Sequence, residues 1–443
     1  MASPVLYTLT SGLHGEMTPD ARREPFIQAL EAALGTPFDC RGDDFRGYGQ
    51  AEGPELIYIR TGGTEGLFLK KVAPLLAIPL EGAQGVKATR KQPIRLLASG
   101  QSNSLAASME ILSWLRQRGF AGEILHGRPA DIAARLRAGA AENGSPAAET
   151  AFLQPVSFGR ILAGRRFGVI GKPSDWLISS EVDYTAARDV LGAELVDIPI
   201  EELVEEVRLG DSPDPKKAVF DATPDSGAGG GTGNAPNRCR LKPLNAPRYG
   251  KKLDESDFRG ALAIYGALRR LVARYRLDGL TLRCFDLLDV LHNTGCLALA
   301  ILNAEGITAT CEGDIPALLS MAVVRERTGS AAFQVNLSRI DGDRLLFAHC
   351  TVPLSLVRSY RYDTHFESGI GVAIHGELPE GPVTLFKLSP DLRHMMCLEA
   401  RLTENPYDDN LCRTQVVVEA PGASDYFLRT PICNHHVLFP GKL

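Results

Sequence analysis

The chain has 443 residues, which is more than one hydrophobic core usually supports, so we expect two or three domains. Its 44% hydrophobic and 23% charged residues are typical of a globular protein. A net charge of -5 argues against nucleic acid or an anionic membrane surface as the main partner. No apolar run reaches the roughly 18 residues of a membrane span.

The cysteines and the N-terminus indicate the compartment. The nine cysteines are scattered and form no Cys-x-x-Cys pair, which disfavours a zinc ribbon or a thioredoxin-like motif. The first residues do not show the basic segment and apolar stretch of a signal peptide. We therefore expect a reduced, cytoplasmic protein whose cysteines pack as small apolar side chains.

Residues 1–155 alternate short apolar runs with helical patterns, as in "PVLYTLTS" followed by "ARREPFIQALEAAL". This alternation predicts βαβ units and a parallel sheet. The segment 143–150 has loop composition and marks the end of this first α/β domain. A second α/β pattern begins near "RRFGVIGKPSDW", and we assign residues 156–328 to a second domain.

The second domain is interrupted by a Pro- and Gly-rich segment at 211–253, which contains "SGAGGGTGN". A glycine-rich loop can bind phosphate when a strand precedes it and a helix follows. Here three prolines and no helix start follow. A flexible linker or lid is therefore the favoured interpretation over a phosphate site.

Residues 329–443 change to a period of two, with short strands separated by turn residues. Strands at this spacing without intervening helices predict an antiparallel sandwich or barrel. The predicted fold class is therefore α/β, with two Rossmann-like domains that contain parallel sheets, followed by a C-terminal antiparallel β-barrel domain.

Two carboxylates stand where the apolar strand "GITATC" gives way to a helical pattern. Asp314, followed by Ile315 and Pro316, predicts a helix N-cap. Glu312 precedes that cap and is not explained by it. It lies at the carboxyl end of a strand, where open α/β sheets place ligands, so it is a candidate site residue.

The predicted hairpin "FQVNLSRIDGDRLLFAHC" places Gln334 and Asn336 on one face of a strand. If Asp341-Gly342 is the turn, His349 lies opposite Gln334, and if Gly342-Asp343 is the turn, it lies opposite Asn336. Both registers put His349 on the face of the two amides, whereas an odd shift would not.

The segment "ICNHHVL" near the C-terminus adds two histidines. In an extended strand His435 and His436 point to opposite faces, so only one of them can serve a given site. Together with Glu312 and His349, one such histidine makes Glu/His ligation of a divalent metal a hypothesis to test.

Several motifs carry a family resemblance: "TGCLALAILNAEGITATCEGD", "LLFAHCTVP", "THFESGIGVAIHG", "LCRTQ" and "NHH". Together they resemble the L-fucose isomerase-like proteins, which are distantly related to L-arabinose isomerase. The resemblance covers roughly residues 280–443, and it extends more loosely over the N-terminal half through "RTGGTE", "SGQSNS" and "GVIGKPSDW".

The resemblance implies an enzyme that interconverts aldoses and ketoses through an enediolate, using Mn²⁺ or a similar divalent ion. It also implies a homo-oligomer, a trimer or a hexamer, acting on a small-molecule sugar. Glu312 matches the first metal-binding carboxylate, which can also transfer protons. His435 matches the metal-binding histidine near the C-terminus, with Asn434 beside it as a substrate contact, and His349 lies where the arabinose branch supplies another histidine.

One feature departs from that pattern. Fucose isomerases carry an acidic ligand in a motif like Asp-Trp-Asn-Asn, where this chain has Gln334-Val335-Asn336. An amide oxygen ligates a hard cation more weakly than a carboxylate and cannot act as an acid or base. Glu367 in "HFESG" is the candidate catalytic substitute. The resemblance therefore implies a substrate other than ordinary L-fucose.

Two further residues are assigned to substrate binding, each with a structural alternative. Thr64 in "TGGTE" belongs either to a sugar-contacting loop or to a tight strand-to-helix turn. Arg413 either contacts substrate or holds the barrel together.

Three functions remain as hypotheses: a metal-dependent sugar isomerase, a sugar-binding or regulatory relative that has lost turnover, and a metal-assisted epimerase or lyase. Metal content and proton exchange at C2 of candidate aldoses distinguish them.

Overall fold

The computed structural model describes residues 3–12, 20–76, 93–138, 152–210 and 253–443. Over these ranges the chain forms two parallel sheets, one larger antiparallel sheet and a separate two-stranded antiparallel sheet, which confirms the predicted α/β fold with a C-terminal barrel. The linker predicted at 211–253 falls, except for its last residue, outside the described residues. No helix in the described part of the chain is long and apolar enough to cross a bilayer.

The first parallel sheet has the strand order β2-β1-β3-β4-β5. Helices lie between β1 and β2, between β3 and β4 and between β4 and β5, because parallel strands need a crossover connection. Its elements are β1 (Val5–Leu9), η2 (Ala21–Arg23), α1 (Pro25–Leu34), β2 (Asp39–Gly42), β3 (Glu55–Ile59), α2 (Glu65–Lys71), η3 (Ala73–Leu76), β4 (Ile94–Ala98), α3 (Ser104–Gln117), β5 (Gly122–Leu125) and α4 (Pro129–Arg137).

The second parallel sheet has the order β10-β9-β7-β8. The long helix α8 opens with a capping box between Asp254 and Asp257, which satisfies main-chain N–H groups at its start. The elements are β7 (Arg166–Ile170), α6 (Tyr184–Ala186), η4 (Ala187–Leu191), β8 (Glu194–Ile198), α7 (Ile200–Leu209), α8 (Glu255–Tyr275), β9 (Gly279–Leu282), α9 (Asp286–Leu291), α10 (Cys296–Ala304), β10 (Thr308–Cys311) and α11 (Ile315–Thr328).

The antiparallel sheet runs β15-β18-β11-β12-β17-β16, and a further pairing of β15 with β16 closes it into a six-stranded barrel. Strand β6 (Leu153–Pro155), which the predicted boundary assigns to the first domain, pairs with β16. The barrel region comprises β11 (Phe333–Asp341), β12 (Arg344–His349), β13 (Ser359–Asp363), β14 (Ala373–Glu377), β15 (Gly381–Leu388), β16 (His394–Glu404), β17 (Thr414–Glu419), α12 (Ser424–Arg429) and β18 (His436–Pro440).

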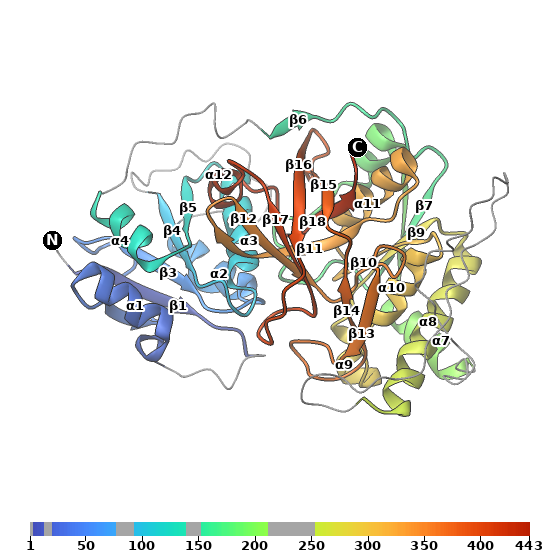
Figure 1. Ribbon diagram of the computed structural model, residues 1–443, viewed down its shortest axis with the longest axis horizontal. Helices are drawn as coiled ribbons and strands as arrows, with labels where there is room; N and C mark the ends of the chain where they lie inside the picture. Colours follow the sequence, from blue (N-terminus) through green and yellow to red (C-terminus); the bar gives the residue numbers. More distant parts are fainter. Residues whose placement is uncertain (1–2, 13–19, 77–92, 139–151, 211–252) are drawn as a thin grey trace.

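The barrel lies between the two α/β units (Figure 1). Helix α3 is buried on every side from Ser104 to Leu115, because it packs between its own sheet and strand β11. Trp114 of this helix belongs to the same apolar core as Phe333 and Val335 of the barrel. The first α/β unit and the barrel therefore share one continuous core, which fixes their relative position.

The β11–β12 hairpin corrects the predicted register. Asp341 pairs with Arg344, so Gly342-Asp343 is the turn, as in one of the two alternatives. A bulge between Leu337 and Arg339 then shifts the pairing by one residue, and Asn336 faces Ala348 instead of His349. The expected pairing of His349 with an amide of β11 is therefore wrong, because alternation in sequence does not reveal a bulge.

A buried histidine links the first α/β unit to the barrel. His126 donates from Nδ1 to the carbonyl of Ala98 over 2.9 Å, and its Nε2 accepts from the main-chain N–H of Ile340 over 3.0 Å. Only the neutral ring can accept at Nε2. Burial lowers the pKa of His126 to about 4, so the ring is neutral at physiological pH.

The His126 contact predicts an acid-sensitive domain junction. Since the pKa is about 6.5 in the unfolded chain and about 4 in the folded one, the contribution is complete above pH 6.5 and is lost as the pH falls toward 4. We expect the free energy of unfolding of the wild type to fall by about 2 kcal/mol more than that of His126→Asn between pH 8 and pH 5. Urea unfolding at both pH values measures this. The exposed His394→Asn is the control, and parallel losses in wild type and His126→Asn would contradict the assignment.

Candidate functional site

The carboxyl ends of both parallel sheets meet the barrel at one place. Loops that follow β3 and β4 of the first sheet, and β7, β9 and β10 of the second, line one pocket together with β11 and the residues before β18. Open α/β sheets bind ligands at this edge, because the loops there expose main-chain and side-chain polar groups. The fold thus brings three parts of the chain to one cavity.

Glu312 is directed toward this cavity by a sharp turn at the end of β10. Glu312 and Gly313 both adopt left-handed backbone conformations, with φ of 65° and 72°. A Cβ on Gly313 would lie 2.3 Å from the carbonyl oxygen of Lys172, so the turn requires glycine. Asp314 then begins α11 by accepting from the N–H of Ala317 over 2.6 Å, which confirms the predicted cap.

Three potential ligand atoms converge at Glu312. Its Oε1 lies 3.7 Å from Nε2 of His349, at the end of β12, and 3.4 Å from Nε2 of His435, which precedes β18. The ligand atoms of the three residues all lie within 4.8 Å of one another, so they could hold a metal ion. The structure therefore brings together the carboxylate and two of the histidines singled out in the sequence.

The two imidazoles are held by their other nitrogen atoms. Nδ1 of His435 is 2.8 Å from Oδ2 of Asp314, and Nδ1 of His349 is 3.0 Å from Oγ1 of Thr351. Nε2 of His435 is buried and has no hydrogen-bond partner in the described protein. Metal-binding histidines are oriented in this way by a second polar group. One carboxylate oxygen and two imidazole nitrogens suit Mn²⁺, Fe²⁺ or Zn²⁺, so the residues fit a divalent ion.

Buried charges of opposite sign surround these atoms. Burial opposes charge on His435, but Glu312 and Asp314 outweigh it and raise its pKa to about 10. Burial likewise opposes charge on Glu312, yet the two neighbouring imidazoles hold the pKa of Glu312 well below its usual value. The fully buried Nζ of Lys387 lies 3.6 Å from Oδ1 of Asp314 and helps to lower the pKa of that carboxyl. Both carboxylates are thus ionised in their buried positions.

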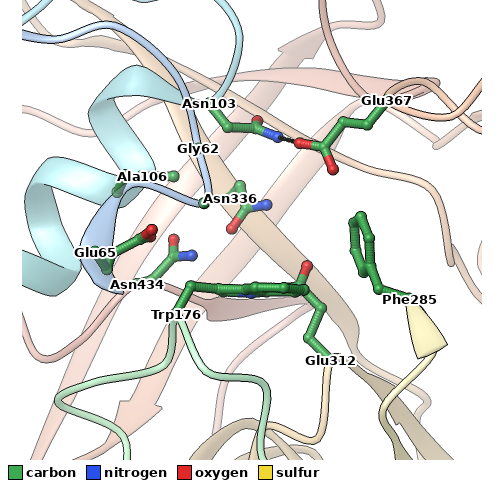
Figure 2. A pocket seen from close by; sticks show the side chains of 12 residues that line it. Gly62, Glu65, Asn103, Ala106, Trp176, Phe285, Glu312, Asn336, Glu367 and Asn434 are labelled. Carbon is green, nitrogen blue, oxygen red and sulfur yellow. Dashed lines mark hydrogen bonds between the residues drawn. The ribbon is translucent and has the colours of Figure 1, made fainter. Parts of the chain in front are cut away.

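Figure 2 shows the cavity beside Glu312, with acidic and amide side chains around it and two aromatic rings at one side. The indole N–H of Trp176 donates to Oε2 of Glu312 over 2.5 Å, and Phe285 packs edge-on against Trp176. The lining consists of Gly62, Gly63, Glu65, Asn103, Ala106, Ala107, Trp176, Phe285, Glu312, Asn336, Glu367 and Asn434.

Glu367 lies across the cavity from Glu312. Its Oε1 accepts from Nδ2 of Asn103 over 2.7 Å (Figure 2). Burial, together with repulsion from Glu312, raises the pKa of Glu367 to about 7. A carboxyl group with such a pKa can both take up and release a proton near neutral pH.

Arg413 supports the segment that carries Glu367 and does not line the cavity. Its Nε donates to the carbonyl of Thr364 over 2.8 Å, and the guanidinium lies 3.7 Å from Asp363. Two roles were predicted for Arg413, a substrate contact and a support of the barrel region. Its contacts with Thr364 and Asp363 agree with the second role.

The two amides of β11 differ in their surroundings. Gln334 accepts at Oε1 from the N–H of Cys311 over 2.8 Å and donates from Nε2 to the carbonyl of the same residue over 3.4 Å. It therefore ties the end of β10 to the barrel and is occupied by main-chain groups. Asn336 lines the cavity, and its buried Oδ1 has no partner in the described protein.

Of the two other predicted substrate contacts, Asn434 lines the cavity and Thr64 does not. The Thr64 hydroxyl donates to the carbonyl of Thr61 over 2.9 Å, inside the strand-to-helix turn, while Gly62 and Gly63 line the cavity. Asn434 lines the cavity with its side chain, and its main-chain N–H donates to the buried Glu110 over 2.9 Å. The segment "TGGTE" is therefore a strand-to-helix turn that also lines the cavity.

Besides Ala106 and Ala107, four lining residues with polar or aromatic side chains were not singled out in the sequence: Glu65, Asn103, Trp176 and Phe285. Three of them lie within the motifs "RTGGTE", "SGQSNS" and "GVIGKPSDW", so those motifs carried the signal. Phe285 follows β9 without a motif of its own, and only its position after a parallel strand could have indicated it.

No protein-family model matches the chain. Sulfoquinovose isomerases from Priestia aryabhattai and from Priestia megaterium (strain ATCC 12872 / QMB1551) are each 30% identical to it over 171 residues. The match covers 36% of this chain and 37% of each relative, so it spans little more than a third of their length. Over that part, the chain is similar to sugar isomerases.

The turn at Gly313 leads to a prediction about stability. Gly313→Ala adds a Cβ against main-chain atoms at a positive φ, whereas Gly342→Ala meets the same backbone conformation with nothing within 4 Å. We expect Gly342→Ala to lower the free energy of unfolding by about 1 kcal/mol and Gly313→Ala by about 3 kcal/mol or more. Urea unfolding of both variants measures the difference, and equal losses would show that the close contact at Gly313 costs nothing.

Proposed function

We propose that the chain is a metal-dependent aldose–ketose isomerase of sugars, in which Glu312, His349 and His435 hold a divalent ion. The observation that carries the proposal is the convergence of these three ligand groups at the edge of a cavity that also contains Glu367. The partial similarity to sugar isomerases supports the same class of reaction. Mn²⁺ is the ion we propose, because the donor set combines oxygen and imidazole nitrogen.

The metal would polarise the carbonyl and neighbouring hydroxyl oxygens of an open-chain sugar. Among the residues of the chain, the low pKa of Glu312 keeps it an anionic ligand. Of the two amides on β11, Asn336 is the one that lines the cavity, because the Gln334 amide is occupied by main-chain groups of Cys311. Trp176 fixes the carboxylate of Glu312 through its indole N–H.

Glu367 is the group we propose for proton transfer. As a carboxylate it takes the proton from C2, which gives an enediolate with a C1–C2 double bond and the negative charge on O1. The hydroxyl proton then passes from O2 to O1, and Glu367 returns its proton to C1 as the carbonyl forms at C2. Its pKa of about 7 suits both directions. Asn103 holds the side chain in place.

Sulfoquinovose, named in the relatives' activity, is one candidate substrate. It carries a sulfonate, and anions are usually bound by Arg, Lys or main-chain N–H groups. The described lining contains no Lys, Arg or His. We therefore include uncharged aldoses beside sulfoquinovose as substrates to be tested.

A pair of carboxyl variants separates metal binding from proton transfer. We expect Glu312→Gln to weaken Mn²⁺ binding at least tenfold and to abolish proton exchange at C2 of the aldose. Glu367→Gln should keep Mn²⁺ affinity within about twofold and lower exchange by about 10² to 10⁴, because it removes only the acid–base group. Calorimetry with Mn²⁺ and NMR of sugars in deuterated buffer measure the two quantities.

The exposed Glu399→Gln is the control for this pair and should change neither quantity. Unchanged metal affinity and exchange in Glu312→Gln would show that the metal is held elsewhere. If the wild type binds one or more of the tested sugars but catalyses proton exchange in none of them, the chain is a binding protein and the isomerase proposal fails.

A further inference from the structure

Unpaired hydrogen-bond acceptors gather around the cavity. Glu65 Oε2 and the Oδ1 atoms of Asn103, Asn336 and Asn434 are buried, line the cavity and have no hydrogen-bond partner in the described protein. The four residues are 2%, 9%, 4% and 5% exposed. Buried polar atoms are nearly always paired, so four unpaired acceptors at one cavity indicate a ligand that supplies donors.

Among these residues Asn103 belongs to the reacting end of the cavity, because it holds Glu367, whereas Glu65 and Asn434 lie away from it. Figure 2 shows Glu65 and Asn434 on the side of Ala106, away from Phe285, while Asn336 lies between them and Glu367. Each comes from a different part of the chain: the start of α2, strand β11 and the segment before β18. A sugar whose first two carbons lie at Glu312 would extend its remaining carbons toward Glu65.

The charge of the lining limits what these acceptors can bind. Its ionisable side chains, within the described residues, are Glu65, Glu312 and Glu367, all carboxyl groups. A sulfonate or phosphate has only acceptor oxygens, so it would face other acceptors without a balancing cation. A hydroxyl group donates one hydrogen bond and accepts others, which matches both the carboxyl group and the amides.

We propose that Glu65, together with Asn336 and Asn434, is a specificity-determining residue that binds the hydroxyl groups of an uncharged aldose beyond its reacting carbons. The proposal rests on the isomerase function proposed above, and it names the substrate class of that site. Glu65 contacts substrate and takes no part in the proton transfer that we assign to Glu367.

The surroundings of Glu65 agree with this role. Burial, together with repulsion from Glu110, Glu312 and Glu367, raises the pKa of Glu65 well above its usual value. A protonated carboxyl group both donates and accepts, so one side chain can pair with a hydroxyl in either direction.

The test compares Mn²⁺-loaded wild type with Glu65→Ala, Glu65→Gln and Glu52→Ala, the last an exposed carboxylate of the same α/β unit. Proton exchange at C2 is followed for uncharged aldoses (D-glucose, D-mannose, L-fucose and L-arabinose) and for 6-deoxy-6-sulfo-D-glucose, which differs from glucose only at C6. Mn²⁺ affinity and thermal unfolding verify that each variant is folded and loaded.

We expect the wild type to process at least one uncharged aldose with a kcat/KM at least about tenfold above that for the sulfonated sugar. Glu65→Ala should raise KM for that aldose by about tenfold or more, and Glu65→Gln should restore most of the loss because the amide still forms hydrogen bonds. Glu52→Ala should match the wild type. A wild type that prefers the sulfonated sugar, or an unchanged KM in Glu65→Ala, would overturn the proposal.

A complete absence of exchange would defeat the isomerase function, and the role of Glu65 would then be decided by calorimetry. Weaker binding of an uncharged aldose to Glu65→Ala than to wild type would support the hydroxyl-binding role on its own. Equal binding, or no binding to either protein, would overturn it.

Discussion

The hydrogen bond between Asp314 and His435 is the contact on which the arrangement of the site depends. One oxygen of the carboxylate caps α11 through Ala317, and the other holds Nδ1 of the imidazole at 2.8 Å. Both side chains are fully buried, so removing either partner would deprive the other of one of its compensating charges. Because Asp314 belongs to the second α/β unit and His435 to the barrel, this bond sets the position of Glu312 relative to both histidines.

Much of the fold could be predicted because it depends on local pattern. The strand-to-helix alternation and the change to a period of two each reflect which face of an element is buried. Asp314 was predicted as a cap from its immediate neighbours, and Glu312 stood out because no local role explained it. The alternation of His435 and His436 also held: His435 faces Glu312, while His436 bonds to the hydroxyl of Tyr426.

The rest depends on contacts between distant segments, which a single sequence does not display. The bulge at Ser338 shifts the pairing of β11 with β12 by one residue. The residues before it and those after it each still alternate between the two faces of the strand, so the sequence pattern does not show the shift. Gln334 had the right chemistry for a ligand, but the end of β10 uses both of its amide atoms. Asn103 and Glu367 are 264 residues apart, and nothing near either one predicts the other.

The position of the last strand has a consequence for biosynthesis. Strand β18 lies between β15 and β11 and pairs with both. Without β18 these two strands have no direct pairing, and the ring of strands stays open at this point. His435 immediately precedes this strand. A chain synthesised only as far as β17 therefore holds an open barrel and lacks His435, so Glu312 and His349 gain their third potential ligand only when β18 is in place.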